Sequence, residues 1–305
     1  MTKSIRNLTL HDALRHILSE QYAIMVDTVP GVLADDDPEP LHDLRVASRR
    51  SRTALSRLRP AIDPDQGNAL RDIYRDLVRT TNRMRDLDVY VDVFSNYFNL
   101  VPPAMHPELR RYLKRLRERR NRESHKIAAT LTSEPFQNQL ARLDIAIHGD
   151  PGLLPGPRAG APALPYACRK ILKRYHQVIT IGAGLDETAP DTEFHQLRIR
   201  CKKLRYMMEF FRNYFPKNQV ENLIRQMKSL QTLLGDFNDL SVQIRILDSD
   251  LTRGRNIDTR TAAMLGGLIV ALRGRKDALR KRFHSTFDTF SRPKTESTFQ
   301  KIYGI

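Results

Sequence analysis

The stretches LHDLRVASRRSR at residues 41–52 and FHQLRIRCKKLR at residues 194–205 are two copies of one pattern, 153 residues apart. The basic positions that match across the copies are His42 with His195, Arg45 with Arg198, Arg49 and Arg50 with Lys202 and Lys203, and Arg52 with Arg205. The same offset aligns RDLDV, which begins at Arg85, with NDLSV, which begins at Asn238, and it aligns Tyr22 with Tyr175. The chain therefore contains a diverged internal repeat.

The residues around both copies follow a helical period. Apolar residues recur at spacings of three and four, and no stretch alternates between apolar and polar residues as a half-buried strand would. The expected helices span residues 9–29, 38–59, 65–98 and 107–131, followed by a short helix to about residue 147. The first starts at a Thr9–Asp12 capping box and ends before Pro30 and Gly31.

Residues 149–165, GDPGLLPGPRAGAPALP, are rich in proline and glycine and predict a linker or extended connection. We therefore expect an all-α protein with a first helical repeat at 1–148 and a second at 166–305. Each repeat has about four helices, which predicts two tandem four-helix bundles related by a pseudo-two-fold axis.

The overall charge predicts a polyanionic partner. Lys and Arg number 51 against 35 Asp and Glu, which gives a formal net charge of +16. Such a field favours nucleic acid, an anionic membrane or a phosphate polymer. Trp is absent and aromatic residues make up 7%, which disfavours the stacking platforms used to bind single-stranded nucleic acid.

Neither a secretory signal nor a membrane span is expected. Polar residues interrupt the first 30 positions, and no apolar run approaches the ~20 residues that cross a bilayer. Cys168 and Cys201 lie in no metal-binding pattern and are interpreted as buried, reduced thiols. We expect a cytoplasmic protein.

Each repeat carries one row of cations along one helix face. Positions i, i+3, i+7 and i+10 fall within about 80° of one another, so His42, Arg45, Arg49 and Arg52 form a row about 15 Å long. His195, Arg198, Lys202 and Arg205 form the second row. Neither row contains an acid to relieve the repulsion between like charges, which indicates a site for a bound anion. Arg50 and Lys203 lie about 80° off the rows.

Further candidate rows are less distinctive. On the helix after Pro107, Arg115, Arg119, Arg122 and Lys126 share a face. The last long helix offers Arg273, Lys276 and Arg280 on one face, or Arg275 and Arg282 on another, and the sequence leaves this choice open. Arg71, Arg75 and Arg79 are interleaved with acids and are interpreted as a salt-bridged surface.

The paired strings HDLRVASRRSR and HQLRIRCKKLRY, with RDLDV and NDLSV downstream, resemble the conserved-histidine α-helical domain (CHAD) family over nearly the whole chain. The resemblance implies a basic central groove or pore, binding of inorganic polyphosphate, and association with polyphosphate granules. It also implies that His42, Arg45, Arg49, Arg50 and Arg52, with their five counterparts in the second repeat, line the groove. Asn238 departs from the pattern, because an arginine is expected before Asp239.

The sequence leaves three alternatives to simple polyphosphate binding. An enzyme acting on polyphosphate would need carboxylates to hold magnesium, and the basic rows contain none; Asp88 and Asp92 share a helix face, but a solvated face is the simpler interpretation. A nucleic-acid binder is permitted by charge, at least as adventitious binding, but shows no docking motif. A histidine metal site would need a nearby second ligand, which both histidines lack. We therefore predict no catalysis, no cofactor and no metal.

Overall fold

The computed structural model describes residues 8–253 and 257–304. Within these residues the secondary structure is helical, with two isolated β-bridges and no strand, so the all-α prediction is confirmed. The α-helices are α1 (Leu10–Ala34), α2 (Glu39–Arg57), α3 (Pro64–Thr80), α4 (Asn82–Val93), α5 (His106–Leu131), α6 (Glu134–His148), α7 (Ala163–Ala183), α8 (Asp191–Phe210), α9 (Lys217–Arg253), α10 (Thr259–Ser291) and α11 (Pro293–Tyr303).

The first helix starts as the sequence predicts and ends later. The Thr9 hydroxyl accepts a hydrogen bond from the backbone N–H of Asp12, so the capping box is confirmed. The predicted end before Pro30 is wrong, because Pro30 lies inside the last turns of α1 and the helix closes at a left-handed Asp35 (φ 57°). Gly31 instead permits a close approach, since a Cβ there would lie 2.7 Å from Pro40 at the start of α2.

The predicted helix over residues 65–98 is broken into three pieces. α3 ends at Thr80, α4 begins at Asn82, and a 3-10 helix (η3, Phe94–Leu100) follows. The periodicity of the sequence misses the break at Thr81 because buried apolar residues continue through it on both sides, at Leu77 and Met84.

The proline- and glycine-rich stretch 149–162 is held by backbone hydrogen bonds. Asp63 N donates to Leu154 O (2.9 Å), Gly156 N donates to Ala61 O (3.2 Å), and Leu10 N donates to Ala161 O (2.9 Å). Gly156 is required here, because a Cβ at this position would lie 2.3 Å from the carbonyl oxygen of Ile62. This connection is therefore packed against the start of α1 and the α2–α3 turn.

By their contacts the helices divide into two compact units: unit 1 comprises residues 1–89 and 116–167, and unit 2 comprises residues 90–115 and 168–305. The segment 90–115, which belongs to the first repeat in sequence, thus packs with unit 2. The predicted pseudo-two-fold axis and the groove between repeats stay predictions.

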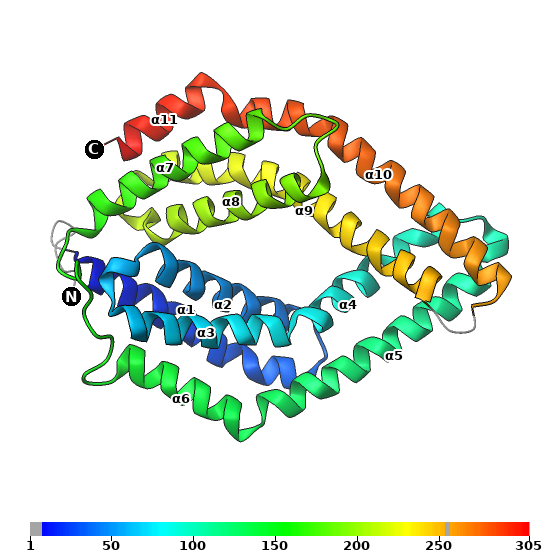
Figure 1. Ribbon diagram of the computed structural model, residues 1–305, viewed down its shortest axis with the longest axis horizontal. Coiled ribbons are helices and arrows are strands. Elements are labelled where there is room, and N and C mark those ends of the chain that lie inside the picture. The colour runs from blue at the N-terminus through cyan, green and yellow to red at the C-terminus, as the bar shows by residue number, and fades with distance from the viewer. Residues whose placement is uncertain (1–7, 254–256, 305) are drawn as a thin grey trace. The chain divides into compact units, whose positions relative to one another are not determined.

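Each unit has its own core. In unit 1, α2 packs between α1 and α3, and α6 packs on α1 (Figure 1). In unit 2, α9 packs against α8, α10 and α11, around aromatic pairs such as Tyr175 and Phe299, whose ring centroids are 4.0 Å apart. Both cysteines are free and buried in unit 2, as predicted.

A buried arginine joins three helices of unit 1. Arg120 of α5 donates from Nε to Asp88 of α4 (2.8 Å) and from Nη1 to Asp35 at the end of α1. The Asp88 side chain is 2% exposed and that of Arg120 is 15% exposed. Burial raises the pKa of Asp88 above its ordinary value, although the hydrogen bond and charge of Arg120 act in the opposite direction.

Replacing Arg120 by Ala should therefore destabilise unit 1 by about 3 kcal/mol at pH 7, because a buried carboxylate loses its partner. The pKa of Asp88 should rise further in the variant. The loss of stability should then shrink as the pH falls through this raised pKa, since the folded state binds the proton more tightly than the unfolded state.

Chemical denaturation at pH 7 and pH 5 measures both effects. Arg117→Ala, on the exposed side of the same helix, is the matched control and should change stability by less than about 0.5 kcal/mol. Equal stabilities of the two variants would contradict a structural role for Arg120.

Candidate anion-binding site

The cation row on α2 lies beside further arginines of unit 1. His42, Arg49 and Arg52 are half-buried. Burial lowers the pKa of Arg52, and the charges of Arg71 and Arg75 on α3 and of Arg49 on α2 lower it further. The guanidinium of Arg52 therefore lies within reach of the charges of three other arginines, and a bound polyanion would offset the effect of these charges.

His42 extends this cluster toward α4. Burial lowers the pKa of His42 below its ordinary value of 6.5, and the nearby charges of Arg85 and Arg49 lower it further, against the opposing effect of Glu39 and Asp43. An anion bound beside the imidazole would raise this lowered pKa and favour the protonated form. We name the group His42, Arg49, Arg52, Arg71, Arg75 and Arg85 the α2 patch.

The salt-bridged surface predicted for Arg71, Arg75 and Arg79 is confirmed for two of them, since Arg75 lies 2.7 Å from Asp72 and 3.4 Å from Asp76, and Arg79 lies 3.6 Å from Asp76. The charge of Arg75 still lowers the pKa of Arg52. Sequence reasoning did not place Arg71, Arg75 or Arg85 beside the α2 row. Arg71 donates to Asn68 (3.2 Å), a neutral partner. The i, i+4 spacing of Arg71 and Arg75 could have indicated that the two arginines share one face of α3. In the structure the charges of both act on Arg52 of α2.

Arg45, the second residue of the row, is turned into the protein. It is 5% exposed. Its guanidinium donates from Nη1 to Val78 O (2.8 Å) and Thr81 Oγ1 (2.6 Å), and from Nη2 to Asn82 Oδ1 (2.8 Å). Burial lowers its pKa to about 10, and the charge of Arg49 contributes to the shift. Arg45 thus supports the α3–α4 break from inside, where the last carbonyl groups of α3 lack helical partners.

The second repeat places its row on α8 of unit 2. His195 is exposed, and its Nδ1 donates to Asn238 Oδ1 (2.7 Å) on α9. Asn238 Nδ2 in turn donates to Asp239 Oδ1 (3.2 Å), which fixes the amide so that its oxygen faces the imidazole. The Nε2 atom is then the nitrogen left to meet a ligand. Asn238, which stands where the family pattern has an arginine, therefore orients the His195 ring.

The remaining α8 residues are half-buried: Arg198, Lys202, Lys203 and Arg205. Arg205 lies 3.6 Å from Glu209 one turn along the helix and 5.7 Å from the centre of the Tyr206 ring. The corresponding position in the first repeat is Ser56, so the second row carries an acid that the first lacks.

Two predicted residues on the last long helix hold the fold together. Lys276 and Arg280 on α10, 17% and 15% exposed, each lie 2.7 Å from an oxygen of Asp191 at the start of α8. Burial alone would raise the pKa of Asp191, but Lys276, Ser241 and Arg280 lower it below its ordinary value. Arg280 also lies 5.0 Å from the centre of the Phe194 ring. Arg273, on the same predicted face, is exposed.

The predicted row on α5 is split between the two units. Arg115 belongs to unit 2 and lies 5.9 Å from the centre of the Tyr112 ring, whereas Arg119, Arg122 and Lys126 belong to unit 1. Lys126 pairs with Glu123 at 3.0 Å, and Arg83 of α4 pairs with the same carboxylate at 3.3 Å. The α5 row is therefore partly neutralised. Arg50, off the main row on α2, is half-buried.

The interpretation of Asp88 and Asp92 as a solvated face is wrong for Asp88, whose side chain is 2% exposed and accepts a hydrogen bond from Arg120, whereas Asp92 is exposed. Residues 8–253 and 257–304 contain no cluster of three or more potential metal ligands. None of the described helices is long and apolar enough to cross a membrane.

Comparison with known proteins places this chain in a family. The CHAD domain model matches residues 16–248, so the chain belongs to the CHAD domain family. The match covers both basic rows and both downstream Asp-Leu strings.

Two solved structures share the fold. The CHAD domain from the plant Ricinus communis has a TM-score of 0.74 at 21% identity and covers 92% of this chain and 93% of its own. PptA from Streptomyces chartreusis has a TM-score of 0.68 at 18% identity and covers 92% of this chain and 100% of its own. The curated proteins give no match to the chain.

The different positions of Arg45 and Arg49 lead to a stability prediction. Arg45→Met should lower the free energy of unfolding by about 2–3 kcal/mol, because three buried or partly buried groups lose a charged donor. Arg49→Met should leave it unchanged or raise it slightly, since it relieves repulsion. Urea denaturation of both variants measures the difference. Similar losses in the two would show that Arg45 has no special structural role.

Proposed function

We propose that this protein binds inorganic polyphosphate without catalysis, through the α2 patch and the row on α8. The observation that carries the proposal is that Arg49 and Arg52 lie half-buried on one face of α2 with His42, near the charges of Arg71 and Arg75 on α3. A folded protein keeps such a cluster at a cost in stability, and a polyanion is the ligand that removes this cost. Membership of the CHAD family supports the same ligand.

Arginine suits this ligand for geometric reasons. A planar guanidinium can donate two parallel hydrogen bonds to phosphate oxygens, and several of them along a helix can follow a linear chain of phosphates. Each contact displaces counterions from the chain, so affinity should increase with chain length and fall steeply with salt. The half-buried setting of Arg49 and Arg52 weakens screening by solvent and strengthens each contact.

The proposal includes no catalytic step. Transfer or hydrolysis of a phosphoryl group normally needs magnesium held by carboxylates, together with a base. The α2 patch consists of guanidinium groups and one imidazole. A binding protein of this kind would serve to hold, sense or organise polyphosphate in the cytoplasm, including at polyphosphate granules.

A titration with three ligands tests the assignment. Long polyphosphate, tripolyphosphate and single-stranded DNA are compared by calorimetry at about 150 mM salt, which screens loosely placed charges. We expect long polyphosphate to bind most tightly. Equal affinity for DNA would show that the protein binds polyanions by charge alone, without selecting for the shape of polyphosphate. The nucleic-acid alternative would then replace the proposal.

Charge reversal then tests the location. Arg49→Glu combined with Arg52→Glu should weaken binding of long polyphosphate by about 100-fold or more, because two charge-assisted contacts are lost. Arg142→Glu, an exposed arginine on α6 of the same unit, is the control and should have little effect. Circular dichroism checks that all variants remain helical. An unchanged affinity in the double variant would place the ligand elsewhere.

Binding should also depend on pH. The pKa of His42 lies below 6.5 in the free protein and should rise beside bound phosphate, so binding takes up a proton. Affinity should therefore increase as the pH falls from 8 to 6, by up to about tenfold per pH unit for each histidine involved. His42→Gln should reduce this slope. A slope identical to wild type in this variant would exclude His42 from the site.

A further inference from the structure

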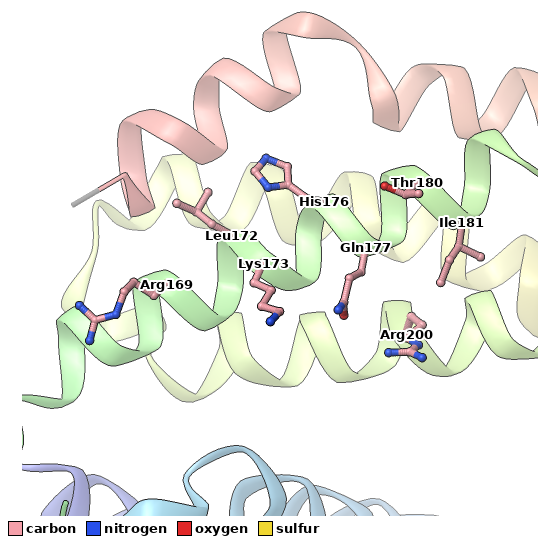
Figure 2. Close-up of a pocket in the computed structure, with 8 residues that line it drawn as sticks. All are labelled: Arg169, Leu172, Lys173, His176, Gln177, Thr180, Ile181 and Arg200. Carbon is pink, nitrogen blue, oxygen red and sulfur yellow. The ribbon is translucent and has the colours of Figure 1, made fainter.

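A basic groove lies on unit 2, between α7 and α8. It has a volume of about 650 Å³, within the range of small-molecule sites. Figure 2 shows its lining side chains along one exposed face of α7, with Arg200 opposite on α8. The lining residues are Arg169, Leu172, Lys173, His176, Gln177, Thr180, Ile181 and Arg200.

The groove carries an excess of positive charge. Its lining includes Arg169, Lys173 and Arg200 and no carboxylate. Within residues 8–253 and 257–304 no ion pair involves these three cations. Glu296 on α11 lies 4.0 Å from His176. The half-buried Arg174 lies near Arg200, since burial lowers the pKa of Arg174 and the charge of Arg200 lowers it further.

The rest of the lining would not be needed for an inorganic anion. Leu172 and Ile181 give the groove two half-buried aliphatic side chains. Between them, Gln177 is held by Arg174, whose Nη1 donates to the Gln177 Oε1 (2.6 Å). This contact leaves the amide N–H groups of Gln177 to donate to a ligand, as the Thr180 hydroxyl also can. The groove thus combines cations, apolar contacts and neutral donors.

The groove is separate from the row on α8. Arg200 is about 140° from His195 around that helix, so the two side chains leave it in different directions. The repeat also shows that this charge is particular to unit 2. The offset of 153 residues pairs Lys173 with Glu20 and Arg200 with Ala47. In unit 1, Glu20 instead forms an ion pair with His16 at 3.5 Å.

We propose that the α7–α8 groove is a binding site for a small organic phosphate with an apolar body, of the class of a nucleoside triphosphate. Arg169, Lys173 and Arg200 hold the phosphate groups. Leu172 and Ile181 cover the base and sugar, while Gln177 and Thr180 form hydrogen bonds to polar edges of the ligand. The site stands apart from the α2 patch and does not depend on polyphosphate binding there.

The test uses ATP, tripolyphosphate and adenosine, titrated into the whole protein at about 150 mM salt. Tripolyphosphate has the phosphates without the apolar body, and adenosine has the body without the phosphates. We expect ATP to bind several-fold more tightly than tripolyphosphate and adenosine to bind weakest. Failure of ATP to bind, or equal affinity for ATP and tripolyphosphate, would overturn the proposal.

Two variants locate the ATP site. Lys173→Glu combined with Arg200→Ala introduces the residues found at the matching positions of unit 1, and should weaken ATP binding at least about tenfold while long polyphosphate still binds. Arg49→Glu combined with Arg52→Glu should leave ATP binding intact. The reverse pattern, with ATP lost only in the α2 variant, would show that ATP binds the α2 patch and would overturn the groove site without affecting the polyphosphate proposal.

Discussion

The buried guanidinium of Arg45 is the interaction on which the basic site of unit 1 depends. It satisfies Val78 O, Thr81 and Asn82 at the point where α3 stops and α4 begins. Because this support comes from α2, both following helices are held against the helix that carries the cation row. Arg71 and Arg75 then approach from α3, and Arg85 from α4. The buried Arg45 thereby helps to hold the arginines of the α2 patch near one another.

The two basic rows differ in the helices and charges beside them. At the position of the α3–α4 break, the second repeat runs through Leu234 and Gly235 within the unbroken α9. Asn238 replaces Arg85 beside the histidine, and Glu209 replaces Ser56 beside the last arginine of the row. These exchanges reduce the positive charge around α8 relative to α2.

Several of the basic residues stabilise the fold. Arg120, Lys276 and Arg280 each hold a carboxylate that ties separate helices together. A helical wheel cannot distinguish such residues from ligand-binding ones, because it gives the direction of a side chain and not what lies opposite. For Lys276 and Arg280 the opposite residue is Asp191, 89 positions from Arg280 in the chain, and the local pattern around α10 contains no trace of it.

The sequence by itself determined the helical class, the repeat, the capping box at Thr9 and the two cation rows, because periodicity and spacing are local properties of a helix. Only the tertiary structure decided that Arg45 is buried while Arg49 and Arg52 face other arginines, that Pro30 lies within α1, and that residues 90–115 pack with the second unit. These features depend on contacts between side chains and backbone groups that are far apart in the sequence. Tertiary packing determines those contacts.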